Sequence, residues 1–301
     1  MNVENLVFSG GGIKGYAYVG VIKSLEERNI LPNIKNIAGT SIGSIFSLLI
    51  CLKYSFKEIE KLSLNINLEN INNVNSDNII NFLSFFGIDN GEKIERLIKI
   101  FVKAKINKND ITFKELYEYS NINLFINSTR VNDRNNIIYN HMDYPEFSVI
   151  KAIRMSVSIP FFYIPIKDNN NYFIDGAVSN NFLIELFKND INKTLGFLIT
   201  DSYSTSEIND FYEYFENIFY SLIDYDYEEL NKFHYIKLES DLNLLNFNIN
   251  NEEKNTLITL GYSETNNYLD NFVEKKLYNS KQTQTETKKF KEASTQTDLI
   301  T

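Results

Sequence analysis

Short apolar runs, each followed by glycines and then by a helical repeat, occur twice in the first fifty residues. Residues 5–9 form an apolar strand candidate that leads into three glycines, and residues 14–28 then repeat apolar side chains at helical spacing. Residues 36–38 are a second strand candidate, and an apolar helix is expected over 44–52. Two strand–glycine–helix units in succession predict right-handed βαβ connections and a parallel sheet.

The remainder of the chain mixes helical and strand patterns. Residues 56–120 are expected to be mainly helical, with a turn at Asp89-Asn90-Gly91. Further strands are expected at 124–128, 137–140, 172–174, 195–200 and 233–238, and helices at 146–155 and 252–276. Aromatic side chains recur at helical spacing over 208–227, where they are expected to line a core or a groove. We therefore expect one α/β domain over 1–277 and a disordered polar tail over 278–301.

Composition narrows the function classes. The 301 residues are 43% hydrophobic and 23% charged, which is ordinary for a globular protein, and the net charge of −9 argues against a nucleic-acid partner. A single cysteine suits a reducing compartment, and two histidines leave little room for a metal site. No signal peptide or membrane span is expected. We expect a cytoplasmic protein without metal or cofactor, able to bind membranes peripherally.

The first chemical motif is Gly10-Gly11-Gly12-Ile13-Lys14-Gly15, which lies between the first strand and its helix. It fits a dinucleotide-binding pattern formally, but the second strand ends without the carboxylate that would bind the ribose. A P-loop is also excluded, because no Lys-Ser or Lys-Thr pair follows. Consecutive glycines at a helix N-terminus can instead direct backbone N–H groups toward one point. This arrangement predicts an oxyanion hole.

The second motif supplies a nucleophile. Gly39-Thr40-Ser41-Ile42-Gly43 has the form G-x-S-x-G and again lies between a strand and an apolar helix. The flanking glycines allow a sharp turn that lifts the Ser41 hydroxyl out of the backbone.

Ser41 needs a base, and three candidates were compared. His141 lies in a polar turn and His234 in a strand-like segment, and neither has a supporting motif. Asp175 follows a short strand and precedes Gly176-Ala177, where a tight turn can orient its carboxylate. Because an ordinary aspartate is a weak base, an apolar environment is expected to raise its pKa, with these candidates nearby: Phe161, Phe162, Phe173 and Ile174. We predict a Ser41–Asp175 dyad.

Taken in order, the two glycine motifs and the Asp175-Gly176-Ala177 turn resemble the three signatures of patatin-like phospholipases. The run 152–160, which ends in Ser158-Ile159-Pro160, and the paired asparagines that follow Val178-Ser179 extend the likeness. The family often has a proline where this chain has Phe182. The resemblance covers about residues 5–200.

The resemblance implies a three-layer α/β/α fold with a mainly parallel sheet and a helical insertion. It implies metal-independent hydrolysis of lipid acyl esters through an acyl-enzyme, with Ser41 as nucleophile and Asp175 as proton acceptor. Backbone N–H groups around Gly11, Gly12 and Ile13 would hold the oxyanion. Lys14 fits the family's basic position, although a solvated lysine at a helix start is an equal alternative.

The insertion over 56–120 has no clear family match and is a candidate for a lipid-facing cap. Within it, the apolar run 82–87 is suited either to inserting into an interface or to filling a core, and we favour burial.

The tail contains two Thr-Gln-Thr motifs, Thr283-Gln284-Thr285 and Thr295-Gln296-Thr297. They resemble the short motif that binds the dynein light-chain hub as an added strand, and two copies would raise avidity for a two-fold partner. A chance recurrence in a polar tail explains the pattern equally well.

The leading hypothesis is a phospholipase A-type lipid acyl hydrolase. An acyltransferase or a neutral-lipid esterase would use the same dyad. A catalytically idle protein that acts as an adaptor through its tail is the alternative from another class.

Overall fold

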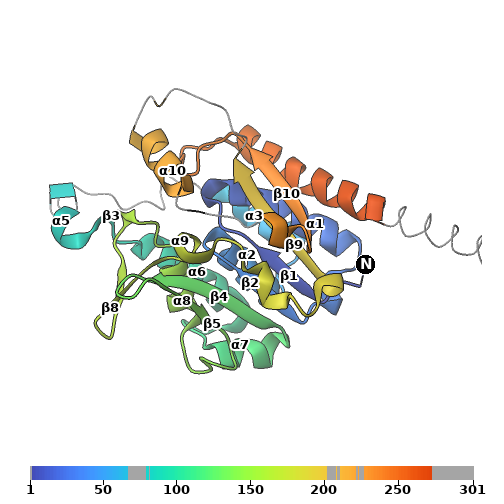
Figure 1. Cartoon of the computed structure of the whole chain (residues 1–301). Coiled ribbons are helices and arrows are strands. Elements are labelled where there is room, and N and C mark those ends of the chain that lie inside the picture. Colours follow the sequence, from blue (N-terminus) through green and yellow to red (C-terminus); the bar gives the residue numbers. More distant parts are fainter. Residues whose placement is uncertain are drawn as a thin grey trace, which may run out of the picture.

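The computed structural model describes residues 2–66, 79–80, 82–201, 208, 211–221, 223 and 227–272. The predicted tail motifs and the last residues of the predicted C-terminal helix therefore lie outside the described residues. The chain forms an α/β fold in which helices flank a central sheet (Figure 1).

An eight-stranded mixed sheet organises the described residues, in the order β10-β9-β1-β2-β4-β8-β7, with β5 also paired to β4. Its strands are β1 (Asn5–Phe8), β2 (Asn36–Gly39), β4 (Asn123–Arg130), β5 (Asn135–Tyr139), β7 (Ile166–Asp168), β8 (Asn171–Asp175), β9 (Thr194–Asp201) and β10 (His234–Ser240). The five strands from β10 to β4 are parallel, as the βαβ pattern predicted. β5, β7 and β8 extend this sheet by antiparallel pairing.

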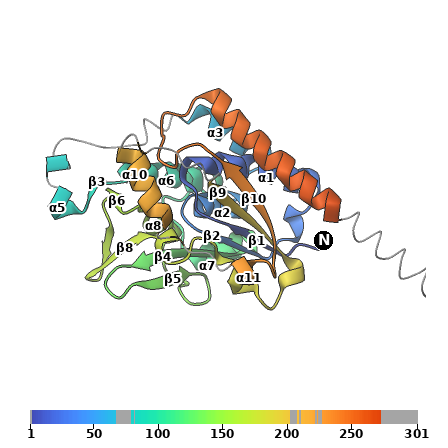
Figure 2. The same ribbon diagram turned by 45° about the horizontal axis from the view of Figure 1, so that its top comes forward.

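Helices cover the two faces of this sheet (Figures 1 and 2). The α-helices of the chain are α1 (Ala17–Glu27), α2 (Ile42–Cys51), α3 (Phe56–Asn65), α5 (Phe82–Phe85), α6 (Glu92–Ile106), α7 (Phe113–Ser120), α8 (Val149–Ser156), α9 (Ala177–Asn180), α10 (Phe211–Ser221) and α11 (Tyr227–Leu230), of which α5 lies away from the sheet. Residues 251–272 form the C-terminal helix. None of the described helices is both long and apolar enough to cross a bilayer.

The two faces of the sheet pack against different layers, because successive side chains of a strand point to opposite sides. From β1, Leu6 and Phe8 join the larger core with α1, α2 and α8. Val7 points to the other face and packs with Leu183 and Phe187 of the short 3-10 turn Leu183–Phe187. The central strands are therefore buried on both faces, which explains their almost continuous apolar sequence.

The insertion over 56–120 departs from the prediction in one respect. Its described residues, 56–66, 79–80 and 82–120, are mainly helical, but they also contain the short strand β3 (Gly87–Asp89), which pairs in parallel with β6 (Phe161–Tyr163). The predicted turn at Asp89-Asn90-Gly91 precedes α6, where Gly91 has φ +67° and donates its N–H to the Asp89 carboxylate at 2.6 Å. The β3–β6 pairing joins the insertion to the strand that follows Ile159-Pro160.

The expected burial of the run 82–87 is wrong. Five apolar side chains around α5 are exposed, with exposed fractions of 79% for Ile80, 85% for Leu83, 43% for Phe85, 51% for Phe86 and 58% for Phe161. α5 is a four-residue helix at the periphery of the fold (Figure 2). So short a helix packs too little of its surface against the rest of the protein to bury these side chains. We call these five residues the α5 patch.

Candidate active site

Ser41 lies at a strained turn between β2 and α2. β2 ends at Gly39, and Ser41 immediately precedes α2 with φ 51° and ψ −125°, a conformation that is costly for a residue with a side chain. Gly43 permits this turn, since a Cβ atom there would lie only 2.5 Å from the carbonyl oxygen of Phe8 on β1. The Ser41 N–H donates to the hydroxyl of Ser156 at 2.9 Å. The turn therefore holds the serine side chain above the carboxyl end of the parallel strands.

Asp175 is brought to Ser41 by the antiparallel part of the sheet. It is the last residue of β8, which pairs with β4, and its backbone N–H donates to the Ser158 carbonyl at 2.8 Å. The Ser41 hydroxyl donates to Asp175 Oδ2 at 2.6 Å, while Oδ1 accepts the N–H of Ala177 at 2.8 Å. The carboxylate is thus fixed by two contacts and by the strand that carries it.

Burial changes the acidity of this carboxyl group. Asp175 is 1% exposed, and desolvation raises its pKa to about 7, against the opposing effect of the hydrogen bonds from Ser41 and Ala177. The apolar side chains that line its pocket include Ile159, Phe219 and Leu244. Phe161, which the sequence suggested for this role, is exposed instead. The chain therefore holds a carboxylate whose proton affinity suits base catalysis near neutral pH.

The glycine loop lies across the same pocket, which Gly10, Gly11 and Gly12 line together with Ser41 and Asp175. Gly10 donates its N–H to Asn181 Oδ1 at 3.0 Å, and Ile13 donates its N–H to the Leu244 carbonyl at 3.2 Å.

Within the described part of the chain, the N–H groups of Gly11 and Gly12 have no assigned acceptor. Gly12 has φ +51°, and a Cβ there would lie 2.4 Å from the Leu244 carbonyl oxygen. The Ile13 N–H, which is also among the predicted oxyanion donors, is bonded to the Leu244 carbonyl in this structure.

Three polar residues whose roles the sequence did not predict support this arrangement. Asn127 of β4 accepts a hydrogen bond from the Thr40 hydroxyl at 2.9 Å and donates to the Gly176 and Asn180 carbonyls at 3.1 and 2.8 Å. Asn127 therefore ties the serine turn to the aspartate turn, while Asn181 and Ser156 bind Gly10 and Ser41 as described above. Asn181 belongs to the asparagine pair after Val178-Ser179 and Ser156 to the run 152–160, whereas Asn127 belongs to none of the sequence motifs.

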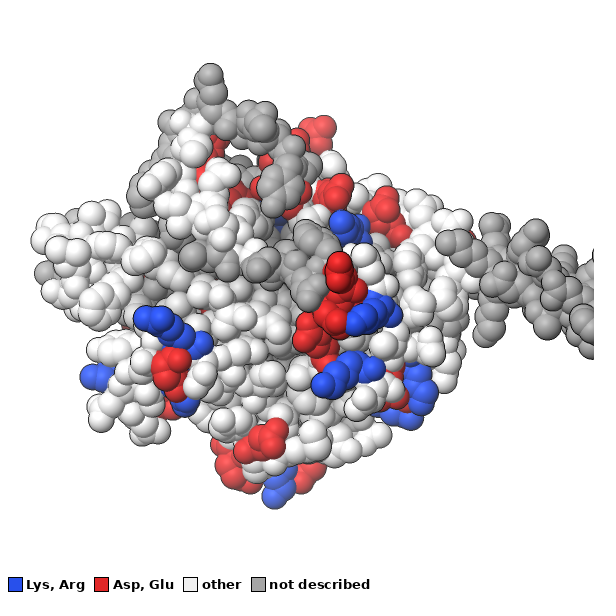
Figure 3. Space-filling model, in the orientation of Figure 1, with Lys and Arg blue, Asp and Glu red and all other residues white. Residues whose placement is uncertain are grey.

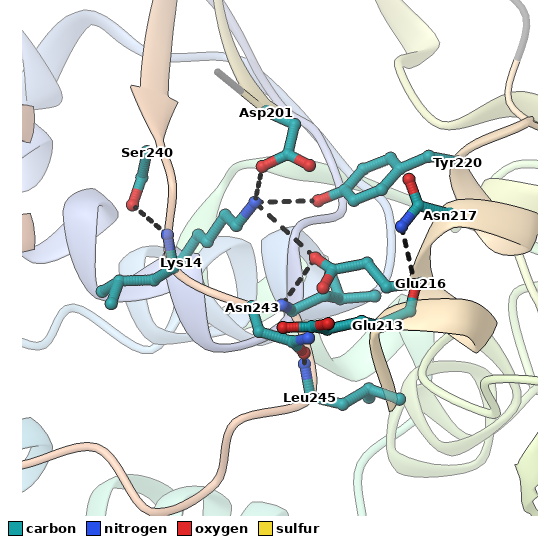
Figure 4. Close-up of polar contacts among 11 residues, drawn as sticks. Lys14, Asp201, Glu213, Glu216, Asn217, Tyr220, Ser240, Asn243 and Leu245 are labelled. Carbon is teal, nitrogen blue, oxygen red and sulfur yellow. Dashed lines mark hydrogen bonds and ion pairs between the residues drawn. The ribbon is translucent and has the colours of Figure 1, made fainter. Parts of the chain in front are cut away.

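Lys14 is buried, so the alternative of a solvated lysine at the helix start is wrong. It is 1% exposed, and its ammonium group lies 2.6 Å from Asp201 Oδ1, 3.2 Å from the Tyr220 hydroxyl and 3.8 Å from Glu216 Oε1 (Figure 4). Glu216 also accepts the Leu244 N–H at 2.7 Å. Because Tyr220 and Glu216 belong to α10, Lys14 joins the glycine loop to the helix that lines the catalytic pocket.

Neither histidine lies at this site. His141 binds Asn123 at 2.6 Å and stacks on Tyr117, and His234 binds the Tyr268 hydroxyl at 3.0 Å. Among the described residues, no group of three or more His, Cys, Asp or Glu side chains is placed to hold a metal ion. The polar groups gathered around Ser41 are therefore those of a serine–aspartate pair with backbone donors nearby.

Comparison with known proteins gives relatives of similar length. The chain is 28% identical over 274 residues to the uncharacterized protein R571 of Acanthamoeba polyphaga mimivirus, covering 86% of this chain and 91% of that protein. It is 29% identical over 270 residues to the probable lipid hydrolase 463L of Invertebrate iridescent virus 6, covering 85% and 88%.

Solved structures agree on the fold. The crystal structure of VipD from Legionella pneumophila matches with a TM-score of 0.59 at 18% identity, covering 90% of this chain and 67% of that one. The type III effector protein ExoU of Pseudomonas aeruginosa matches with a TM-score of 0.54 at 16% identity, covering 90% and 53%. The family model for patatin-like phospholipases matches residues 6–188, which include the serine turn, the glycine loop and Asp175. The chain belongs to the patatin-like phospholipase family.

Proposed function

We propose that this protein is a metal-independent lipid acyl hydrolase that uses a Ser41–Asp175 dyad. The observation that carries the proposal is the 2.6 Å hydrogen bond between the Ser41 hydroxyl and a buried carboxylate whose pKa is raised to about 7. Family membership and the viral relative named a probable lipid hydrolase support a lipid ester as the substrate.

The proposed reaction begins with proton transfer from the Ser41 hydroxyl to Asp175 Oδ2. The serine oxygen forms a bond to the ester carbonyl carbon, and the carbonyl oxygen becomes an oxyanion that the N–H groups of Gly11 and Gly12 stabilise. The C–O bond to the leaving alcohol then breaks, and Asp175 returns the proton to that alcohol. Water repeats the sequence on the acyl-enzyme, so that a fatty acid leaves and the free hydroxyl of Ser41 is restored.

Substitution of each dyad member tests the proposal. Fatty acid release from mixed phospholipid vesicles in the presence of a chelator should fall by at least about 10³-fold in Ser41→Ala and Asp175→Asn. Ser47→Ala is a matched control, because Ser47 is an equally buried serine of α2 whose hydroxyl donates to the Gly43 carbonyl of its own helix at 2.7 Å and does not contact Ser41. No release by the folded wild-type protein, on phospholipids or on neutral-lipid esters, would overturn the proposal.

An acyltransferase would use the same steps, with an alcohol in place of water as the final acceptor. Adding glycerol or a lysophospholipid to the same assay separates the two activities, since transfer gives a new ester and hydrolysis gives free fatty acid. We favour hydrolysis, which the name of the viral relative supports. The two Thr-Gln-Thr motifs lie outside the described residues, so the adaptor role that they suggest stays a prediction.

A further inference from the structure

A second cavity lies beside the catalytic pocket, and its walls are almost entirely apolar. Its volume is about 120 Å³, and it opens to solvent at one side. The walls come from the glycine loop, α2, α3 and α6, and none of the lining residues is charged. Tyr16 and Ser63 are the polar side chains among the lining residues, and no cation faces the cavity to bind a phosphate, whereas the apolar walls suit a hydrocarbon chain, whose burial is favourable.

This cavity begins where the chemistry is placed. Gly12 lines both the cavity and the catalytic pocket, and Ile42, which follows Ser41 in sequence, lines the cavity. From there Ile42, Phe46 and Leu49 repeat along one face of α2, about 10 Å of helix at ~1.5 Å per residue. When an ester carbonyl is held between Ser41 and the glycine loop, the hydrocarbon chain attached to it therefore begins beside this apolar face.

The insertion supplies the opposite wall. Leu62 of α3 and Leu97 and Phe101 of α6 line the cavity, and the last two are four residues apart on one helix face. The end of α3 is held in place by Lys254, which donates to the Ile66 carbonyl at 2.8 Å. Phe101 is 3% exposed, whereas Leu97 is only partly buried. Phe101 is thus a fully packed part of the wall. Leu97, which is only partly buried, can be replaced by a larger or smaller side chain with less disturbance of the core.

We infer that this cavity binds the acyl chain of the substrate and that Leu97 limits the chain length accepted. The inference rests on the proposed function, since it assigns the cavity to the ester that Ser41 attacks. Narrowing the cavity at position 97 excludes long chains and leaves short ones unaffected. Widening it extends the range to longer chains.

Chain-length profiles with p-nitrophenyl esters from butyrate to palmitate test the inference in the full-length protein. Leu97→Trp should lower kcat/KM for palmitate by at least about tenfold relative to butyrate, and Leu97→Ala should shift the preference toward longer chains. Ile100→Trp is the matched control, because Ile100 lies on the same helix with 59% of its surface exposed. Identical profiles for Leu97→Trp and Ile100→Trp would overturn the inference.

A binding measurement separates this inference from the proposed reaction. In a Ser41→Ala background, which cannot form an acyl-enzyme, the fluorescent fatty acid cis-parinaric acid should bind, and Leu97→Trp should weaken that binding by at least about tenfold while Ile100→Trp does not. If fatty acid binding depends on Leu97 but the protein with Ser41 intact hydrolyses no ester, the proposed hydrolase activity is refuted and the acyl-chain site is supported. Hydrolysis together with fatty acid binding that ignores Leu97 would refute the acyl site alone.

Discussion

At the scale of single residues, the proposed chemistry depends on a carboxyl group that the fold has removed from water. Asp175 is almost fully buried, and its partners in the site are a serine hydroxyl and a backbone N–H rather than a cation. An isolated aspartate has a pKa of about 3.9 and would be too weakly basic to accept the serine proton efficiently. Desolvation raises the pKa to about 7, so the ionised form is both available and basic at neutral pH.

This pKa predicts the pH dependence of hydrolysis. Only the ionised carboxylate can accept the Ser41 proton, so kcat/KM should rise about tenfold per pH unit below pH 7 and level off above it. A soluble p-nitrophenyl ester measured from pH 5 to 9 checks this, with spontaneous hydrolysis subtracted. A profile that is flat across pH 7 would contradict an Asp175 base.

At the scale of elements, the glycine loop is held by segments that are distant in sequence. Leu244 accepts the Ile13 N–H and donates its own N–H to Glu216, while Glu216 approaches Lys14. Burial raises the pKa of Glu216 to about 6, against the opposing effects of the Leu244 N–H and of the Lys14 ammonium group. The loop and α10 therefore form one polar unit next to the catalytic pocket (Figure 4).

Removing the Lys14 charge should destabilise the folded protein. Lys14→Met leaves Glu216 buried without its cation and should lower the free energy of unfolding by about 1–3 kcal/mol. Adding Glu216→Gln removes the uncompensated charge, so the double variant should lose less stability than the two single variants together. Urea unfolding at pH 8 measures the cycle. Strict additivity would mean that Lys14 and Glu216 do not interact.

At the scale of the whole molecule, the α5 patch is an uncharged projection of the surface. The run 79–88 contains no charged residue, and the projection over α5 in Figure 3 shows neither basic nor acidic atoms. Its Phe161 begins β6, two residues after Ile159 of the catalytic pocket. The patch is therefore connected to the proposed active site through one short stretch of chain, and it is suited to an apolar bilayer interior.

The patch should matter for vesicles and not for dissolved substrates. Leu83→Asp places a charge on a side chain that is 85% exposed, so it should reduce hydrolysis of phosphatidylcholine vesicles by about tenfold or more. Its kcat/KM for a soluble short-chain ester should stay unchanged, because Leu83 does not line the catalytic pocket. Met142→Asp is the control, since Met142 is 63% exposed in a polar turn. Equal vesicle activity of both variants would show that the α5 patch has no part in vesicle hydrolysis.

The sequence by itself determined the family, the βαβ beginning of the fold and the positions of the three short motifs. These features are local, because glycines such as Gly12 and Gly43 are required where the backbone turns sharply or passes close to another strand. The parallel order of the central strands followed from the same pattern, since strand–helix–strand connections have one preferred hand. The mixed character of the sheet did not, because β8 pairs with β4 only through contacts distant in sequence.

Only the tertiary structure decided which groups meet. Ser41 and Asp175 are 134 residues apart, so their motifs suggested the pair but only the fold brings the two side chains to 2.6 Å. Lys14 and Asp201 are 187 residues apart, and no sequence pattern indicated their contact. The pKa of Asp175 and the apolar cavity depend on the side chains that several elements bring to one place. Exposure of the α5 patch was decided in the same way, because hydrophobicity shows which side chains would gain from burial, whereas only packing shows whether a partner surface covers them.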